Sequence, residues 1–201
     1  DEPILSSASC TTNAVAPVLK MLSDEYGIRH GHIETVHSYT NDQNLLDNYH
    51  KAERRGRSAP LNMVITTTGA ASAVVKVLPE LKGKLTGNSI RVPTPNVSLA
   101  MLNLSTERKV GRDELNDFLR RCALQSRYQK QIGYTKDPLV STDLGHSIYT
   151  GVVDSQATLA HDEHVVLYIW YDNEFGYSHQ VKRLVRKICG DTTPEYIGAP
   201  V

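Results

Sequence analysis

Cys10 is the residue of this chain whose type and position could do chemistry. It lies in the run SCTTN (residues 9–13), where a short apolar stretch gives way to a helical pattern. At the first turn of a helix, unpaired backbone N–H groups and the helix dipole stabilise an anion, and the thiolate is the reactive form of cysteine. The hydroxyls of Ser9 and Thr11 add anion-binding donors. An isolated cysteine is usually a buried apolar thiol, but this setting predicts a nucleophile.

His37 is the base that such a nucleophile would need. An expected strand over Pro3–Leu5 leads into the helix that carries Cys10, and the next expected strand, residues 32–39, returns alongside the first, so that the two side chains can meet. An imidazole can take the thiol proton, hold the thiolate as an ion pair and later act as an acid. In such a pair we expect Cys10 to have a pKa of about 3.5–7.5. The alternative is a histidine that is hydrogen-bonded within a sheet.

A second set of residues could bind anions, because helix N-termini flanked by hydroxyls and arginines are typical phosphate sites. The candidates are Thr40, Arg54, Arg55, Arg57, Thr68, Gly69 and Arg91. The basic cluster at residues 53–57 could instead be a solvated surface or a subunit contact. No Walker-type or G-x-G-x-x-G loop occurs, so we expect no nucleotide-binding fold in this stretch.

The elements that must position these residues follow from periodicity. Apolar residues at helical spacing predict helices, and alternating runs that contain β-branched residues predict strands. Helices are predicted at residues 11–26, 70–78, 113–125 and 177–188, and strands at 32–39, 89–93, 97–104, 147–153, 156–159 and 165–171. Residues 41–62 are expected to form a long loop and residues 83–88 a turn-rich connector. Short strands without intervening helices favour antiparallel pairing, so the prediction is an α+β fold with a mixed, largely antiparallel sheet covered by helices.

Composition narrows the class of protein. The chain has 201 residues, 40% hydrophobic residues and a formal net charge of zero, which gives no reason to expect binding to nucleic acid or to a membrane surface. No apolar run approaches the roughly 20 residues that span a bilayer, and no signal peptide is recognisable. Three widely spaced cysteines argue against disulfides and for a reducing compartment, so we expect a cytoplasmic protein. Because the chemistry begins so close to residue 1, we also expect a fragment of a longer protein.

Three other features are read as structural. The segment HDEH (residues 161–164) resembles a metal ligand set, but it lies in an expected hairpin turn without a third ligand, so no metal site is predicted. Cys122 occupies the apolar stripe of a helix and Cys189 ends the last helix, and both are expected to pack. Trp170, on an apolar strand, is expected in the core.

Five motifs, in order and across nearly the whole chain, resemble the glyceraldehyde-3-phosphate dehydrogenase family. They are SCTTN at 9–13, HSYT at 37–40, TTGAA at 67–71, RVPTPNV at 91–97 and WYDNEFGYS at 170–178. The resemblance implies the C-terminal catalytic domain of that family, preceded by a Rossmann NAD-binding domain. Residues 1–172 would form the catalytic domain, and residues 173–201 a helix that docks on the NAD-binding domain.

The resemblance also implies roles for single residues. Cys10 would attack the aldehyde of glyceraldehyde 3-phosphate, and His37 would act as base while hydride passes to NAD or NADP. Inorganic phosphate would then cleave the resulting thioester to an acyl phosphate. Thr40 and Arg91 would hold the substrate's own phosphate. The incoming phosphate would be held by Ser9, Thr11, Arg55, Thr68 and Gly69, with Arg57 as an assisting residue, and Asn173 would contact the nicotinamide carboxamide.

Some positions depart from the family pattern. Ala14 replaces a second cysteine, Phe175 replaces a tryptophan, and the loop at residues 45–50 is similar to that of erythrose-4-phosphate dehydrogenase. That relative hydrolyses the thioester and departs at the Thr68-Gly69 pair, so the phosphorylating enzyme is the preferred prediction. A third alternative is a catalytically inert domain used for assembly.

The resemblance further implies a homotetramer, with the loop at residues 41–62 at a subunit interface near the neighbour's cofactor. For the chain alone we expect no turnover. The apolar face of the last helix, having lost its partner, is expected to be displaced, covered by another molecule or a cause of self-association.

Overall fold

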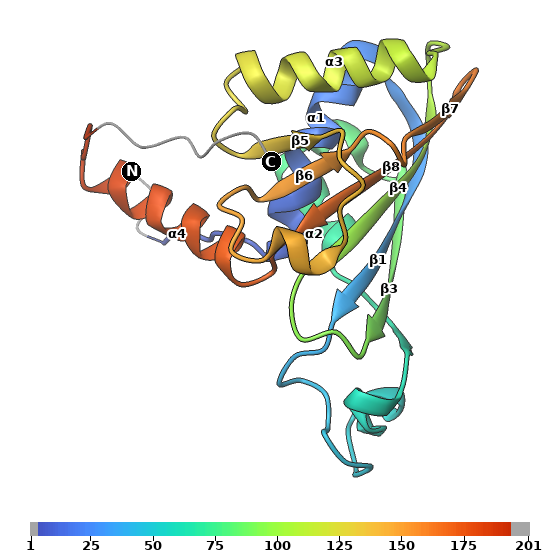
Figure 1. Ribbon diagram of the computed structural model, residues 1–201, viewed down its shortest axis with the longest axis vertical. Coiled ribbons are helices and arrows are strands. Elements are labelled where there is room, and N and C mark those ends of the chain that lie inside the picture. Colours follow the sequence, from blue (N-terminus) through green and yellow to red (C-terminus); the bar gives the residue numbers. More distant parts are fainter. Residues whose placement is uncertain (1–3, 194–201) are drawn as a thin grey trace.

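Residues 4–193 are described by a computed structural model, in which four α-helices and eight strands form one layered unit (Figure 1). The helices are α1 (Cys10–Tyr26), α2 (Ala70–Val77), α3 (Arg112–Gln125) and α4 (Phe175–Ile188). The strands are β1 (Ile28–Ser38), β2 (Val64–Thr66), β3 (Leu85–Val92), β4 (Ser98–Thr106), β5 (Ile132–Thr135), β6 (Gly151–Asp154), β7 (Leu159–His161) and β8 (His164–Tyr171). Short 3-10 turns lie at Glu53–Gly56, Ala59–Leu61, Pro79–Leu81 and Ser141–Leu144.

The strands form one sheet in the order β2-β3-β1-β4-β8-β6-β5, with β7 paired to β8. Strand pairs β1–β3 and β5–β6 are parallel and the other pairs are antiparallel. Helices α1, α2 and α3 lie on one side of the sheet, while the opposite side of β1, β3, β4 and β8 carries no helix (Figure 1). The predicted fold class, α+β with a mixed and largely antiparallel sheet, is confirmed.

Helix α1 carries the central apolar contacts of the layer. Val15, Val18 and Leu22 are fully buried against the sheet, as their helical spacing predicts. The Ser9 hydroxyl caps the helix by accepting from Thr12 N at 3.1 Å. Gly27 ends it with a φ of +68° and is followed directly by β1, so the chain reverses. The start of α1 and the end of β1 therefore lie at the same end of the layer.

The predicted connector at residues 83–88 is right for the turn at residues 83–84 and wrong for residues 85–88, because β3 begins at Leu85. Leu85 pairs with Gly31 of β1, and this tertiary pairing overrides the turn-rich composition. Gly87 serves packing rather than turning, since a Cβ there would lie 3.3 Å from Thr68 and 3.4 Å from Ala71. The prediction also missed β2 and β5, which are three and four residues long and too short to show a period.

The two predicted strands at 147–153 and 156–159 are displaced in the structure. Strand β6 spans only Gly151–Asp154, and β7 starts at Leu159. Asp154 causes the break, because its Oδ1 accepts from the backbone N–H groups of Gln156 and Ala157 and closes a turn. The hairpin between β7 and β8, at residues 161–164, lies where it was predicted.

Three further expectations need correction. Ile4 and Leu5 are 86% and 53% exposed and belong to no strand, and Pro3 lies outside the described residues, so the strand expected before α1 is not found. Cys189 is exposed rather than packed. Trp170 is half-buried against a small second cluster, where its Nε1 donates to Asp154 at 3.1 Å. Cys122 is half-buried and packs against the core, as predicted.

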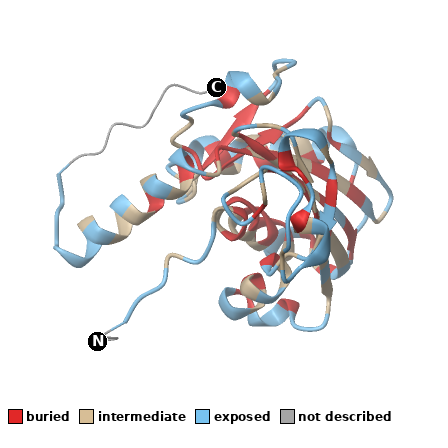
Figure 2. Cartoon of the chain, turned by 90° about the horizontal axis from the view of Figure 1, so that it is seen from below, coloured by how far each residue is buried: buried red, intermediate tan, exposed pale blue. Residues whose placement is uncertain are grey.

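Figure 2 shows that the buried residues gather where α1 meets the sheet, whereas α4 carries mostly exposed and half-buried positions. Val185 and Ile188 of α4 are 51% and 60% exposed. Residues 40–66 form a lobe at the bottom of Figure 1 that contains the predicted long loop. No helix among residues 4–193 is long and apolar enough to cross a membrane.

Candidate active site

The residues of the predicted site converge on one cavity of about 350 Å³. The N-terminus of α1, the ends of β1 and β3 and the start of α2 form its walls. Eight of the predicted site residues line it: Ser9, Cys10, Thr11, His37, Arg55, Thr68, Gly69 and Arg91. The rest of the lining includes Thr35 and Ser89, which sequence reasoning did not single out. The nucleophile, the base and both arginines therefore line the same cavity.

Cys10 and His37 meet because α1 starts where β1 ends. The Cys10 Sγ lies 3.7 Å from His37 Nε2, which is within reach of a hydrogen bond to sulfur. Arg91 is the register partner of His37 in the parallel β1–β3 pair, so both side chains project from the same face of the sheet. The predicted meeting of Cys10 and His37 is confirmed, although it arises from the helix-to-strand reversal at Gly27 and not from a strand before α1.

His37 Nδ1 has two polar neighbours. It lies 2.7 Å from the Ser38 carbonyl oxygen, which can only accept, and 2.8 Å from Arg91 Nη1, which can only donate. Arg91 Nη1 also donates to the Ser38 oxygen at 3.0 Å. A proton on Nδ1 satisfies Ser38 and leaves Nε2 as an acceptor for the Cys10 thiol, whereas a proton on Nε2 lets Nδ1 accept from Arg91. The first tautomer is the one that a general base requires.

Burial keeps both members of the pair neutral in the resting site. Burial, reinforced by the Arg91 charge, lowers the pKa of His37 to about 4. Burial also raises the pKa of the Cys10 thiol above its usual value, although the Thr11 hydroxyl and the Arg91 charge act in the opposite direction. The expected low pKa of Cys10 is therefore wrong, because loss of solvent outweighs the helix N-terminus here. The site holds a thiol beside a free imidazole instead of a preformed ion pair.

The low pKa of His37 makes stability depend on pH. An unfolded chain binds a proton at His37 near pH 6.5, whereas the folded chain does so only near pH 4. The free energy of unfolding should therefore fall as the pH drops from about 6.5 to about 4, by at most about 3 kcal/mol, and level off below that. Urea denaturation at several pH values measures this effect. In His37→Asn the slope should be smaller, and an equal slope would contradict the assignment.

The two arginines of the cavity differ in their charge balance. Arg55 pairs with the Asp42 carboxylate and donates from Nε to Thr66 Oγ1 at 2.9 Å. None of the ion pairs found within residues 4–193 includes Arg91, and its buried Nε has no hydrogen-bond partner there. Arg91 thus brings an uncompensated charge and an open donor into the cavity, which is what an anion would satisfy.

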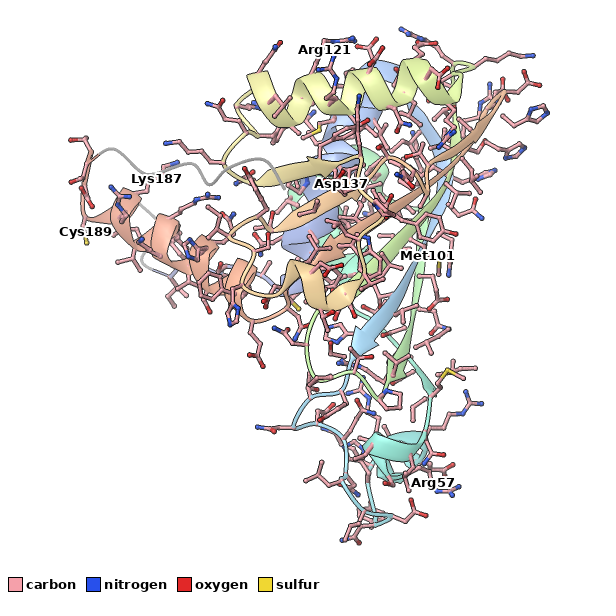
Figure 3. The ribbon with its side chains drawn as sticks, viewed as in Figure 1. Arg57, Met101, Arg121, Asp137, Lys187 and Cys189 are labelled. Carbon is pink, nitrogen blue, oxygen red and sulfur yellow. The ribbon has the colours of Figure 1, made fainter. Side chains whose placement is uncertain are left out.

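Other predicted residues lie outside this cavity. Thr40 follows the end of β1 by two residues and does not line the cavity. Arg54 and Arg57 lie on the outer lobe, where Arg57 pairs with Asp47 at 3.2 Å, and Figure 3 shows Arg57 at the bottom of that lobe. Asn173 precedes α4, and its Oδ1 accepts from the Ser98 hydroxyl at 3.0 Å. Figure 3 places Cys189 at the far end of α4.

Sequence reasoning missed Tyr171 as a neighbour of the site. It is 1% exposed, its hydroxyl lies 2.9 Å from Thr11 Oγ1, and its ring meets the His37 ring edge-on at 6.0 Å between centroids. It packs behind the nucleophile and the base and limits their movement. The one signal in the sequence was that alternation along this strand places Tyr171 on the buried face, where its hydroxyl needs a hydrogen-bond partner.

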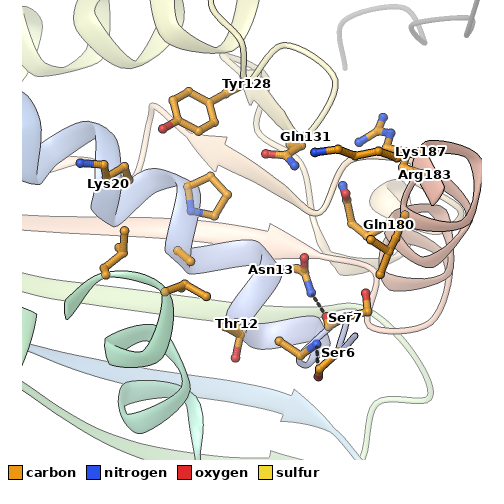
Figure 4. A pocket seen from close by; sticks show the side chains of 16 residues that line it. Ser6, Ser7, Thr12, Asn13, Lys20, Tyr128, Gln131, Gln180, Arg183 and Lys187 are labelled. Atoms are coloured by element: carbon orange, nitrogen blue, oxygen red, sulfur yellow. Dashed lines mark hydrogen bonds between the residues drawn. The ribbon is translucent and has the colours of Figure 1, made fainter. Parts of the chain in front are cut away.

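A larger cavity, of about 490 Å³, lies between α1, the end of α2 and α4 (Figure 4). Its lining contains neither Cys10 nor His37. Lys20 at its rim already pairs with Asp24 at 2.6 Å and with Glu80 at 3.5 Å. Arg183 and Lys187 of α4 enter it beside Gln131 (Figure 4). Its residues offer no nucleophile–base pair, so it is not the reaction site.

Comparison with known proteins gives consistent matches. The sequence model described as "Glyceraldehyde 3-phosphate dehydrogenase, C-terminal domain" matches residues 9–173. A "Glyceraldehyde-3-phosphate dehydrogenase-like protein" of Pseudomonas aeruginosa (strain UCBPP-PA14) is 61% identical over 98% of this chain and 43% of its own length. Glyceraldehyde-3-phosphate dehydrogenase of Priestia megaterium is 46% identical over 92% of the chain and 55% of its own length. Glyceraldehyde-3-phosphate dehydrogenase 2 of Bacillus subtilis is 47% identical over 92% and 54%. The chain thus spans about half the length of these relatives.

Proposed function

We propose, from the premise that the chain belongs to the glyceraldehyde-3-phosphate dehydrogenase family and covers its C-terminal domain, that it is the catalytic half of a phosphorylating aldehyde dehydrogenase. The observation that carries the proposal is the 3.7 Å contact of Cys10 Sγ with His37 Nε2, inside a cavity that also holds two arginines. The proposed substrates are glyceraldehyde 3-phosphate and inorganic phosphate.

The proposed first step uses the neutral pair. As the Cys10 sulfur attacks the aldehyde carbon, the thiol proton passes to His37 Nε2 and from there to the aldehyde oxygen, so that a hemithioacetal forms and the imidazole is neutral again. In the tautomer that this step requires, His37 Nδ1–H donates to the Ser38 carbonyl, which keeps the ring in place. His37 Nε2 would then take the hydroxyl proton of the hemithioacetal as hydride is lost, and the product would be a thioester on Cys10.

A nicotinamide dinucleotide, NAD or NADP, supplies the hydride acceptor when it is bound. Asn173 fits the carboxamide of such a group, because Ser98 occupies its Oδ1 and leaves its Nδ2 hydrogens to donate. Which of the two dinucleotides is used is not encoded in residues 4–193, which hold no glycine-rich phosphate loop.

Two anion sites complete the proposal. Arg91 in the cavity and Thr40 just beyond the end of β1 would hold the phosphate of the substrate. The phosphate that cleaves the thioester would be held by cavity residues: Ser9, Thr11, Arg55, Thr68 and Gly69. The incoming phosphate is well placed for attack because its ligands surround Cys10. The phosphate oxygen forms the new bond to the acyl carbon, the thioester C–S bond breaks, and the Cys10 sulfur recovers its proton from His37.

Turnover with and without inorganic phosphate tests this function. We expect the chain, assembled with a dinucleotide-binding domain of a relative, to oxidise glyceraldehyde 3-phosphate only when phosphate or arsenate is present, and the chain alone to show no turnover. Phosphate-independent oxidation, or a preference for erythrose 4-phosphate, would favour erythrose-4-phosphate dehydrogenase instead. Assembly without any turnover would favour an inert domain.

Docking and oligomeric state are parts of the same proposal. Val185 and Ile188 of α4, with the cavity between α1 and α4, form the surface on which the dinucleotide-binding domain would pack. The lobe at residues 40–66 exposes Leu46, Tyr49 and Leu61 to 78%, 87% and 82%, which suits the proposed contact with neighbouring subunits of a homotetramer. A cytoplasmic location stays a prediction.

A further inference from the structure

The buried hydroxyl of Ser98, the first residue of β4, contacts both the end of β1 that carries His37 and the residue Asn173. Ser98 is 1% exposed. Its Oγ accepts from the backbone N–H of Ser38 at 3.1 Å and donates to Asn173 Oδ1 at 3.0 Å. Ser38 follows the base His37 and is itself fully buried. One side chain therefore contacts both the backbone beside the base and the residue proposed to face the cofactor.

The direction of these hydrogen bonds follows from the groups involved. A backbone N–H can only donate, so the Ser98 oxygen must accept from Ser38. The single Ser98 hydrogen is then free for Asn173 Oδ1. This fixes the Asn173 amide, because its oxygen points inward and its Nδ2 hydrogens point away from Ser98.

We propose that Ser98 is a positioning residue that selects what Asn173 can bind. With its Oδ1 occupied, Asn173 presents only donors, so its ligand must offer an acceptor such as a carboxamide oxygen. This inference rests on the proposed function, because it gives Asn173 that ligand. Through Ser38, whose carbonyl accepts from Arg91 and lies 2.7 Å from His37 Nδ1, the same hydroxyl also anchors the base.

Three variants separate this role from simple packing. Ser98→Ala removes the hydroxyl, Ser98→Thr keeps it, and Ser105→Ala makes the same deletion on the same strand, at its far end and away from the site. Because Ser105 is also buried, at 6% exposure, its variant controls for a general loss of packing. Ser98→Thr remains informative even if Ser98→Ala fails to fold.

The first readout needs no cofactor and uses the chain alone. In Ser98→Ala we expect the Ser38 amide to exchange its hydrogen about tenfold faster and the Asn173 side-chain amide resonances to shift, because each loses its fixed partner. Ser98→Thr and Ser105→Ala should retain the wild-type values. If Ser98→Ala matches Ser105→Ala in both measurements, or if Ser98→Thr loses both, the proposal is overturned.

The second readout uses the chain assembled with a dinucleotide-binding domain. A thionicotinamide dinucleotide offers sulfur, a weak acceptor, in place of the carboxamide oxygen. The ratio of kcat/KM for the natural cofactor over this analogue should fall about tenfold in Ser98→Ala and stay unchanged in Ser105→Ala, whereas general damage would lower both terms equally. An unchanged ratio in Ser98→Ala overturns the selectivity role. If the wild-type assembly is inactive, the proposed function fails, while the amide signature in the chain alone still decides whether Ser98 orients Asn173.

Discussion

Replacing His37 by asparagine should slow the alkylation of Cys10 by iodoacetamide about 100-fold or more at neutral pH. The Cys10 thiol is protonated in the resting site because burial raises its pKa, so its reaction depends on proton transfer to His37 Nε2, 3.7 Å away. A positioned base contributes roughly 10²–10⁴-fold to such a step. Asparagine leaves the thiol with no base, and mass spectrometry of quenched time points gives the rate at each cysteine.

The same samples contain their own controls. Cys189 is exposed at the end of α4, so its rate reports on reagent and conditions and should not change. His32→Asn makes the same exchange on the same strand, where His32 contacts Thr86 instead of a thiol, and should leave Cys10 unaffected. Equal Cys10 rates in His37→Asn and His32→Asn would contradict the base assignment. A Cys10 rate in the wild type no higher than those of Cys122 and Cys189 would contradict the activated thiol itself.

Replacing Arg91 by glutamine should weaken the binding of a phosphate monoester that mimics the substrate, such as glycerol 3-phosphate, about 10- to 100-fold, because a hydrogen bond to a charged group contributes about 1.5–3 kcal/mol. Arg91 is the cavity's arginine without a carboxylate partner among residues 4–193, so the structure offers no other group that balances its charge. The same change should raise the pKa of His37 toward its usual value, since the Arg91 charge is one cause of its depression. Calorimetry with glycerol 3-phosphate and NMR titration of the imidazole measure the two effects.

Arg57→Gln is the matched control for this substitution. Arg57 pairs with Asp47 on the exposed lobe and lies outside the cavity, so its loss should change neither quantity. Affinity for glycerol 3-phosphate that falls equally in both variants would indicate a general effect of net charge. An unchanged pKa of His37 in Arg91→Gln would contradict the electrostatic contact between these register partners.

The nucleophile, its base and most of the anion donors could be predicted because each lies at a position with a local signature. Ser9 caps a helix, Gly27 ends it, and an alternating strand follows directly, so the Cys10–His37 contact requires only one chain reversal. Gly69 likewise precedes a recognisable helix. For these residues the sequence neighbourhood determines the backbone, and the backbone determines where the side chain lies.

The rest depends on contacts that no local pattern records. Leu85 joins a strand because Gly31 pairs with it, and the roles of Ser98 and Tyr171 arise from partners more than 50 residues away. The pKa of Cys10 was predicted with the wrong sign because a helix N-terminus is visible in a sequence, whereas the depth of burial is set by the whole fold. Local patterns therefore predict which residues form the site better than they predict its electrostatics.

Acyl transfer to Cys10 in the chain alone tests the central claim, that a His37-assisted thiol takes part in acyl exchange with phosphate. A simple acyl phosphate needs no dinucleotide, because the Cys10 sulfur forms the thioester bond as inorganic phosphate leaves. Mass spectrometry after incubation with acetyl phosphate should find one acetyl group on Cys10 and none on Cys122 or Cys189, with much slower labelling in His37→Asn. Acetylation of Cys189 as fast as that of Cys10, or labelling of Cys10 that is unchanged in His37→Asn, would contradict the account.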